Sequence, residues 1–272
     1  STNFGARLYL LGDNTTEDLN QPAFNRGVGS SVHLGGAVDN TGDTLAEIGE
    51  IDFAGGSVTG GTSNVNFNAT GNANEFADGV TLNADLNLGG NDSFRILNGL
   101  TLNGTANLAG NSSILEFEGT QGLAADVGNT ATVNMGYQSS QLRVANGGTL
   151  TLDSTVTVVG EGYVGGGGTI HNHGLIHANV NNERLYINPS IFTNTGTLKA
   201  SNNAKLYLYN DWDNNGTIDL DGARLYLYGN FTTSDLNQPA FNRGVGSSVH
   251  LGGALDNTGD TLAEIGEIDF AG

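Results

Sequence analysis

Tyrosines and basic residues recur together in the second half of the chain. Each basic residue stands two positions before a tyrosine, and two of these pairs are followed by a second tyrosine: Arg184 and Tyr186, Lys205 and Tyr207 with Tyr209, and Arg224 and Tyr226 with Tyr228. If the intervening leucines face inward in strands, all eight side chains face outward, because successive residues of a strand point to opposite sides. The pattern predicts a strip that serves as a lateral interface or as a glycan contact, where rings cover sugar faces and cations meet carboxylates. In the alternative interpretation, Glu183, Asp219 and Asp221 neutralise the cations, and tyrosine is present because it suits exposed strands.

Histidines and acidic residues supply two weaker candidates. His171 and His173, with His177 nearby, have i, i+2 spacing on one strand face, which could bind a transition metal, but no further ligand completes the set. The same spacing occurs in two acidic pairs, Glu50 with Asp52 and Asp219 with Asp221. Such pairs could cleave glycans, and they also suit solvated strand faces, which is the interpretation we favour.

Composition excludes several classes of function. There is no cysteine, no phosphate-binding Gly-Lys-Ser/Thr loop, no HExxH and no GxSxG motif. With a net charge of −19 and only nine Lys and Arg, nucleic acid is not expected as a partner. No apolar run is long enough for membrane insertion. We therefore expect no enzymatic activity and no cofactor, although Asp-rich turns leave weak calcium binding open.

A short repeat must position the outward-facing residues. The segments NTGTLKASNNAKLYLY and NNGTIDLDGARLYLY align Asn194 with Asn214 and Gly196 with Gly216, and the unit recurs about every 19 to 22 residues. A unit this short cannot bury a hydrophobic face alone, so the units must stack. The prediction is an all-β, parallel β-solenoid, right-handed, with inward Leu, Ile, Val and Phe.

Asparagine is expected to form a ladder at one corner of the stacked units. The positions that coincide in successive units are Asn172, Asn194, Asn214 and Asn257. Stacked amides hydrogen-bond from one unit to the next, and asparagine tolerates the left-handed turn conformation.

A second, longer repeat sets the organisation of the chain. Residues 5–55 recur at 222–272, an offset of about 217 residues, with only five differences in 51 positions. Residues 1–221 therefore contain one complete long repeat, and residues 222–272 start the next, all within one continuous solenoid about 50 Å long per repeat. We interpret the chain as an internal or processed piece of a longer protein.

The segment 13–29 interrupts the alternation of apolar and polar residues. It contains Pro22 and several asparagines, and its copy contains Pro239. Because proline cannot donate in a central ladder, the sequence predicts that Asp18–Arg26 and Asp235–Arg243 form loops projecting from the stack.

The turn motifs resemble those of a known class of proteins. NTGTLKA, NNGTIDL and NHGLIHA are similar to the Gly/Asn-rich repeats of bacterial filamentous-haemagglutinin-like and autotransporter-like surface proteins. The resemblance implies secretion, an extracellular or cell-surface location, and an adhesive or fibre-forming role in a biofilm matrix. The partners expected are further copies of the chain, end to end or side by side, and polysaccharide. A β-helical carbohydrate-active enzyme, or an autotransporter passenger adhesin that binds glycans, is the alternative.

Overall fold

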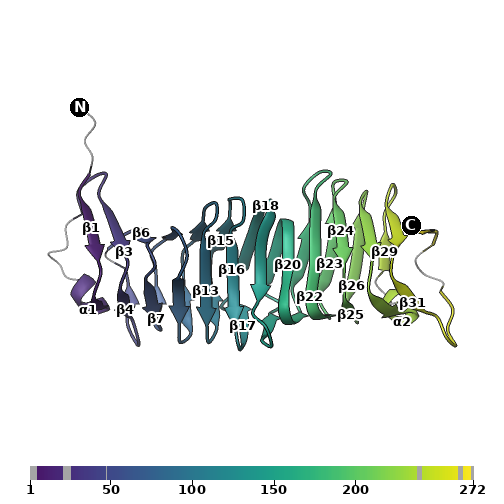
Figure 1. Cartoon of the computed structure of the whole chain (residues 1–272), viewed down its shortest axis with the longest axis horizontal. Helices are drawn as coiled ribbons and strands as arrows, with labels where there is room; N and C mark the ends of the chain where they lie inside the picture. Colours follow the sequence, from purple (N-terminus) through teal and green to yellow (C-terminus); the bar gives the residue numbers. More distant parts are fainter. Residues whose placement is uncertain (1–4, 21–25, 47, 238–240, 263–265, 271–272) are drawn as a thin grey trace.

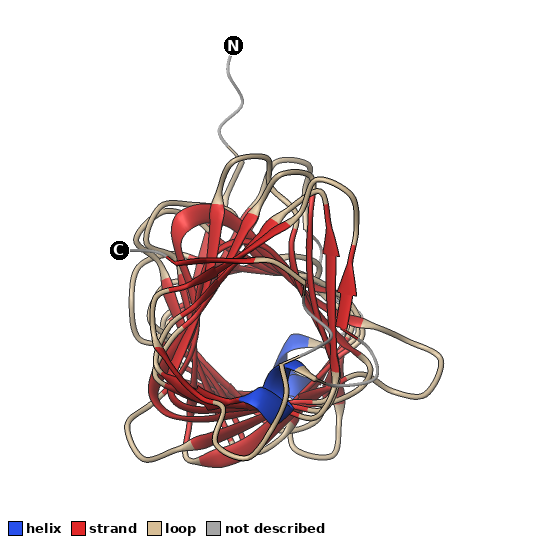
Figure 2. Ribbon diagram, turned by 90° about the vertical axis from the view of Figure 1, so that its right-hand side faces the viewer, coloured by secondary structure: helices blue, strands red, loops and turns tan. Residues whose placement is uncertain are grey.

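The chain forms a single rod of stacked parallel strands (Figure 1). The computed structural model describes residues 5–20, 26–46, 48–237, 241–262 and 266–270. Viewed along its axis, the strands surround a central interior (Figure 2). The predicted parallel β-solenoid is confirmed.

Each coil of the rod contributes to three faces, and every face is a ladder of parallel strands. The first face consists of β1 (Arg7–Leu10), β3 (Ser31–Leu34), β6 (Ile51–Phe53), β9 (Phe67–Ala69), β12 (Leu86–Leu88), β15 (Thr105–Leu108), the start of β18 (Ala131–Val144), the start of β20 (Val156–Asn172), β21 (Leu175–Ala178), β23 (Thr197–Ser201), β26 (Thr217–Asp221) and β29 (Phe241–Arg243).

The second face carries most of the candidate residues. It consists of β2 (Asp13–Thr15), β4 (Ala37–Asp39), β7 (Ser57–Thr59), β10 (Asn74–Ala77), β13 (Ser93–Leu97), β16 (Ile114–Glu118), the end of β18, the middle of β20, the start of β22 (Arg184–Asn194), β24 (Lys205–Leu208), β27 (Arg224–Leu227), β30 (Ser248–Leu251) and β32 (Ile268–Phe270).

The third face completes each coil. It consists of β5 (Thr44–Leu45), β8 (Thr62–Ser63), β11 (Val80–Leu82), β14 (Leu100–Leu102), β17 (Thr120–Ala124), β19 (Thr149–Leu152), the end of β20, the end of β22, β25 (Asp211–Asn214), β28 (Asn230–Thr232) and β31 (Ala254–Asp256).

The interior is filled by the inward-facing apolar residues of all three faces. In β24 and β27 the leucines are buried while the residues between them are half-buried, as expected from strand alternation. Near the first copy, Phe53, Phe67, Phe76 and Phe94 pack with ring centroids 4.6 to 5.9 Å apart, in tilted and edge-to-face geometry. This burial gives every coil the shared core that a single unit lacks.

Coil length varies more than the sequence interpretation allowed. Asn68 lies 16 residues after its ladder neighbour Asp52, whereas Asn134 lies 27 residues after Asn107. The predicted coil length therefore holds only for part of the rod. Extra residues are accommodated at the corners between faces, where loops project without disturbing the ladders (Figure 2).

The prediction that these two segments form projecting loops is wrong for the residues that the structure describes. Asp13–Thr15 is β2, and Thr16–Leu19 forms the short helix α1, whose Leu19 is buried. In the second copy, α2 (Thr233–Leu236) buries Leu236, and Phe241–Arg243 pairs with β26 as β29. A capping box starts each helix, and the buried leucine at its end packs this polar segment against the rod. Pro22 and Pro239 lie outside the described residues.

The two copies of the repeated segment enter the rod on different faces. β1 lies on the first face, whereas its counterpart β27 lies on the second, and β2 and β28 differ in the same way. Ten coils lead from β1 to β26, and β27 is one face further along. The interval between the two copies therefore corresponds to ten coils and one third.

The twist of the rod compensates for this difference of one face, so that the two copies lie on the same side of the rod. α1 and β4 of the first copy lie on the lower side of the rod in Figure 1, and so do their counterparts α2 and β31. The end-on view places both helices on one side of the ring (Figure 2). One third of a turn over ten coils needs a twist of about 12° per coil, which lies within the normal range for β-sheets. The two copies are therefore related nearly by a translation along the rod.

Candidate binding surface

The tyrosines of the strip form a continuous stack on the second face. Tyr186, Tyr207 and Tyr226 pair in register, with ring centroids 4.9 and 4.4 Å apart. Tyr209 and Tyr228 form a second column with a spacing of 4.7 Å. Sequence reasoning placed these five correctly relative to one another and missed the two ends of the first column.

Those two ends are Tyr163 and His250. Tyr163 stacks on Tyr186 at 4.7 Å, and His250 stacks on Tyr226 at 4.5 Å. Neither residue lies in an LYLY motif, but each is the ladder partner of its neighbour, one coil away along the chain. The spacings from Tyr163 to Tyr186 and from Tyr226 to His250 are 23 and 24 residues, both longer than the predicted coil, which is why the sequence pattern missed these rings.

Ring stacking changes the chemistry that the strip can offer. The interplanar angles in the two columns run from 4° to 33°, so the inner rings cover one another's faces. Outward, the strip presents ring edges and hydroxyls, and the expectation that every ring would cover a sugar face is corrected. Burial raises the pKa of Tyr207 to about 12, so its hydroxyl remains a neutral donor at physiological pH.

The basic residues of the strip are aligned but are not paired with the acids that the sequence suggested. Arg184, Lys205 and Arg224 occupy one ladder position. Arg184 donates to the Tyr186 hydroxyl at 3.2 Å, and Lys205 Nζ donates to the Asn182 carbonyl at 3.0 Å. Where the structure describes the chain, none of the three forms an ion pair with a carboxylate.

The acids that were expected to neutralise them lie elsewhere. Asp219 is on the first face, where Lys199 Nζ contacts its carboxylate at 2.6 Å. Asp221 ends the same strand. Glu183 precedes the strip but accepts a hydrogen bond from Gln138. The cations of the strip therefore remain open to an external anion.

The asparagine ladder is present in three of the four predicted positions. Asn172 donates to Asn194 and Asn194 to Asn214, both at 2.7 Å, and all three are buried. The Asn214 amide nitrogen then donates to the Asp235 carbonyl at 3.0 Å. Asn257 is not the next member, because α2 intervenes and the Asn257 amide oxygen accepts from Thr233.

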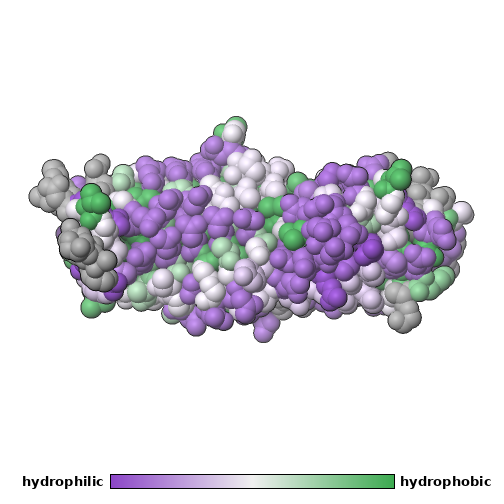
Figure 3. Space-filling model, turned by 90° about the horizontal axis from the view of Figure 1, so that it is seen from above, coloured by the Kyte–Doolittle hydropathy of each residue, from purple (hydrophilic) through white to green (hydrophobic). Residues whose placement is uncertain are grey.

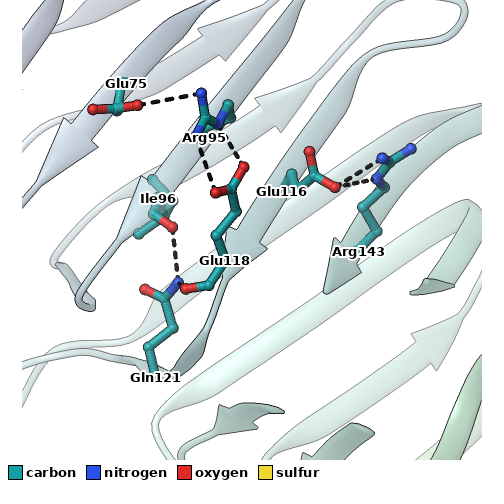
Figure 4. Close-up of polar contacts among 7 residues, drawn as sticks. All are labelled: Glu75, Arg95, Ile96, Glu116, Glu118, Gln121 and Arg143. Carbon is teal, nitrogen blue, oxygen red and sulfur yellow. Dashed lines mark hydrogen bonds and ion pairs between the residues drawn. The ribbon is translucent and has the colours of Figure 1, made fainter. Parts of the chain in front are cut away.

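A charge ladder on the second face was not predicted. Glu75, Arg95, Glu116 and Arg143 follow one another at one register position (Figure 4). Arg95 holds Glu118 through two hydrogen bonds of 2.6 and 2.9 Å. Arg143 contacts one oxygen of Glu116 through Nε at 2.8 Å and Nη2 at 2.7 Å. Successive coils differ in length here, so only the strand register shows that these positions are neighbours.

A pair of carboxyls lies at the corner before the tyrosine columns. Burial, and then the charge of Glu183, raise the pKa of Glu161 above its ordinary value. Its Oε2 is enclosed and has no donor in the described part of the chain. Two carboxyls can hydrogen-bond only when one is protonated, so this corner favours a protonated Glu161.

The histidines and one member of each acidic pair, Asp52 and Asp219, make contacts within the rod. Hydroxyls of the next coil contact His171 at 2.6 Å, His173 at 2.5 Å and His177 at 2.9 Å. Asp52 accepts from Asn68 at 3.0 Å. No group of three metal-ligating side chains is found among the residues that the structure describes.

Comparison of the chain with protein-family models, curated proteins and solved structures finds no match. Among the described residues, no helix combines the length and apolar character needed to cross a membrane. Polar residues cover most of the side of the rod seen in Figure 3, and apolar residues form small separate patches.

Proposed function

We propose that this chain is a structural rod of an extracellular surface fibre or filament, in which long repeats stack into one uninterrupted solenoid with an adhesive, matrix-forming role. The observation that supports this most directly is the junction between the two copies. Lys205 pairs with Arg224, Asp211 with Asn230 and Ile218 with Phe241, so the parallel ladders cross the repeat boundary on all three faces.

Burial at equivalent positions indicates what stacking contributes. Leu225 in the second copy is fully buried, whereas its counterpart Leu8 is 41% exposed because no coil precedes β1 among the described residues. At the other end, Phe270 is 82% exposed, whereas its counterpart Phe53 is fully buried. Burying such side chains stabilises by roughly 1.5–3 kcal/mol each, and open strand edges favour pairing with another coil.

The proposal is tested by adding one further long repeat, a second copy of the segment 5–221, to the chain. Electron microscopy should show rods of unchanged width that are longer by about 50 Å, since ten coils and one third rise about 4.8 Å each. Rods that bend or separate at each repeat boundary would contradict it.

The adhesive role is tested at the tyrosine strip. A variant with Lys205→Gln, Arg224→Gln, Tyr207→Ser and Tyr226→Ser should fold but associate laterally more weakly, and wild-type association should weaken as salt screens the cations. Unchanged bundling and surface binding by the variant would leave the strip without this role.

Incubation with polysaccharides, followed by measurement of new reducing or unsaturated ends, tests the alternative of a carbohydrate-active enzyme.

A further inference from the structure

A groove opens on the second face where the charge ladder meets the tyrosine columns. The outward ladder position runs from Arg143 to Gly165 and then to Asn188, so one coil contributes no side chain there. The resulting cavity has a volume of about 790 Å³, and a smaller one of about 310 Å³ adjoins it. Both are lined by Tyr163 and Asn188, and the larger lies within the usual range of small-molecule sites, roughly 300–1,000 Å³.

Glycine is required at the floor of this groove. A Cβ on Gly165 would overlap the side-chain oxygen of Asn188, and one on Gly167 would overlap that of Asn146. Between them, Gly166 has a φ of 112°, which side chains rarely adopt. A Cβ on Gly166 would also overlap the backbone carbonyl oxygen of Val144, so this glycine fixes the depression in the backbone, whereas the two glycines beside it face asparagine side chains.

Several polar groups line the groove without partners. The side chains of Gln141, Asn146 and Asn188 and the Tyr163 hydroxyl make no hydrogen bond within the described residues, and all four residues line the cavity. Glu116 directs one oxygen to Arg143 and leaves the other open (Figure 4). The groove thus offers both donors and acceptors to a ligand rich in hydroxyls.

Tyr163 also offers a flat apolar surface. It is the last ring of its column, with Tyr186 stacked against one face at 4.7 Å. On the other side, its ladder partner is Gln141, which is not aromatic. Among the stacked tyrosines, Tyr163 is thus placed to present a ring face to the larger cavity, where the CH face of a sugar could pack.

The charges of the groove compensate one another. The two carboxylates that line it, Glu116 and Glu118, are held by Arg143 and Arg95 respectively. An anionic ligand would meet these carboxylates in a chain whose net charge is already −19. We infer that the groove binds a short neutral oligosaccharide along the rod axis, with Tyr163 against a sugar ring and the amides of Gln141, Asn146 and Asn188 on its hydroxyls. This site is independent of the proposed fibre role and lies beside the tyrosine strip.

The inference is tested by calorimetric titration of the whole chain with neutral glucan, xylan and chitin oligosaccharides and with oligogalacturonate as the anionic probe. We expect at least one neutral series to bind, with an affinity that changes little between low and high salt. Tyr163→Ala should weaken that binding about tenfold, and Asn188→Ala should weaken it by a smaller factor. Tyr9→Ala is the matched control, because Tyr9 also stacks on one neighbouring ring, that of His33 at 4.9 Å, but lies in the first described coil and outside the tyrosine strip, so binding should be unchanged.

Three outcomes would overturn the inference. These are the absence of binding by every neutral probe at millimolar concentration, binding of oligogalacturonate alone, and equal weakening by Tyr163→Ala and Tyr9→Ala. If Tyr163→Ala lowers the thermal midpoint, Gln141→Ala and Asn188→Ala, both outward-facing, replace it, and unchanged binding in both would overturn the inference. Rod length and stacking are measured separately, so failure here does not affect the proposed fibre.

Discussion

At the scale of single residues, the Glu161–Glu183 pair makes stability depend on pH. Because the pKa of Glu161 is raised in the folded chain, the folded state binds its proton more tightly than the unfolded state does. The stabilising contribution is therefore complete below the ordinary glutamate pKa and is lost as pH rises through the raised value. The pair is partly exposed, so the effect on unfolding free energy should stay below about 1 kcal/mol.

Glu161→Gln should remove this dependence. The amide is neutral at every pH and can donate to Glu183, so the variant should be as stable as the parent in acid and more stable at neutral pH. Chemical denaturation at pH 4 and pH 7 measures the difference. An identical pH dependence in parent and variant would show that the two carboxyls do not interact.

The asparagine ladder gives a larger effect. Asn194→Ala removes two buried amide–amide hydrogen bonds, one from Asn172 and one to Asn214, which should lower the free energy of unfolding by about 2–4 kcal/mol. Asn87→Ala is the matched control, because Asn87 occupies the middle of an outward-facing asparagine ladder, donating to Asn68 at 3.0 Å and accepting from Asn107 at 2.9 Å. Equal losses in the two variants would contradict a special role for the buried ladder.

The sequence predicted the positions of residues that lie in recurring motifs, but not of residues that are aligned only by the strand register. Asn194 and Asn214 were visible because the letters around them recur. Tyr163 and Arg143 were not, because their neighbours differ from coil to coil and because ladder neighbours stand from 16 residues apart (Asp52 and Asn68) to 29 residues apart (Thr120 and Thr149). Only the register brings Arg143, Gly165 and Asn188 into one line.

At the scale of elements, the two short helices show that equivalent residues of the two copies make different contacts depending on whether a coil lies before them. Asp18 and Asp235 cap equivalent helices, and each accepts from the threonine three residues before it. Asp235 is only 4% exposed and also accepts from the Asn214 backbone at 2.9 Å, because a coil precedes α2. In the part of the chain that the structure describes, no coil covers the corresponding side of α1.

This difference predicts unequal effects of the same substitution. Asp235→Ala should lower the unfolding free energy by about 2–3 kcal/mol, because it leaves a buried backbone donor unsatisfied. Asp18→Ala should have a clearly smaller effect, since it removes only a solvent-exposed cap. Thermal and urea unfolding of both variants measure the difference, and equal effects would mean that the preceding coil contributes nothing through Asp235.

The helices were also the elements that the sequence least revealed. Thr16–Leu19 and Thr233–Leu236 are too short to show a helical period, and the prolines that follow them suggested loops. The surrounding polar residues gave no sign that one leucine in each helix is buried in the core. By contrast, the alternating strands of β11, β14 and β24 could be predicted, because each buries every second residue.

At the scale of the whole molecule, the long repeat and the twist of the rod are matched. Ten coils and one third advance a repeated feature by one face, and the accumulated twist carries that face back to the same side of the rod (Figures 1 and 2). A repeat with a whole number of coils would instead shift its features by about 120° around the rod at the same twist. Consecutive long repeats should therefore present the tyrosine strip and the groove along one side.

This arrangement can be measured with a single label in each repeat. In a chain with three long repeats, a cysteine introduced at the exposed Thr258 and at its equivalents, and coupled to gold, should give particles in a straight row about 50 Å apart. The native chain has no cysteine, so it adds no background labelling. Deleting the residues of one third-face strand and its corner should break the match, and the particles should then step around the rod. A spiral of labels on the unmodified repeats would show that twist and repeat length are not matched, and that the rod displays its binding surfaces in all directions.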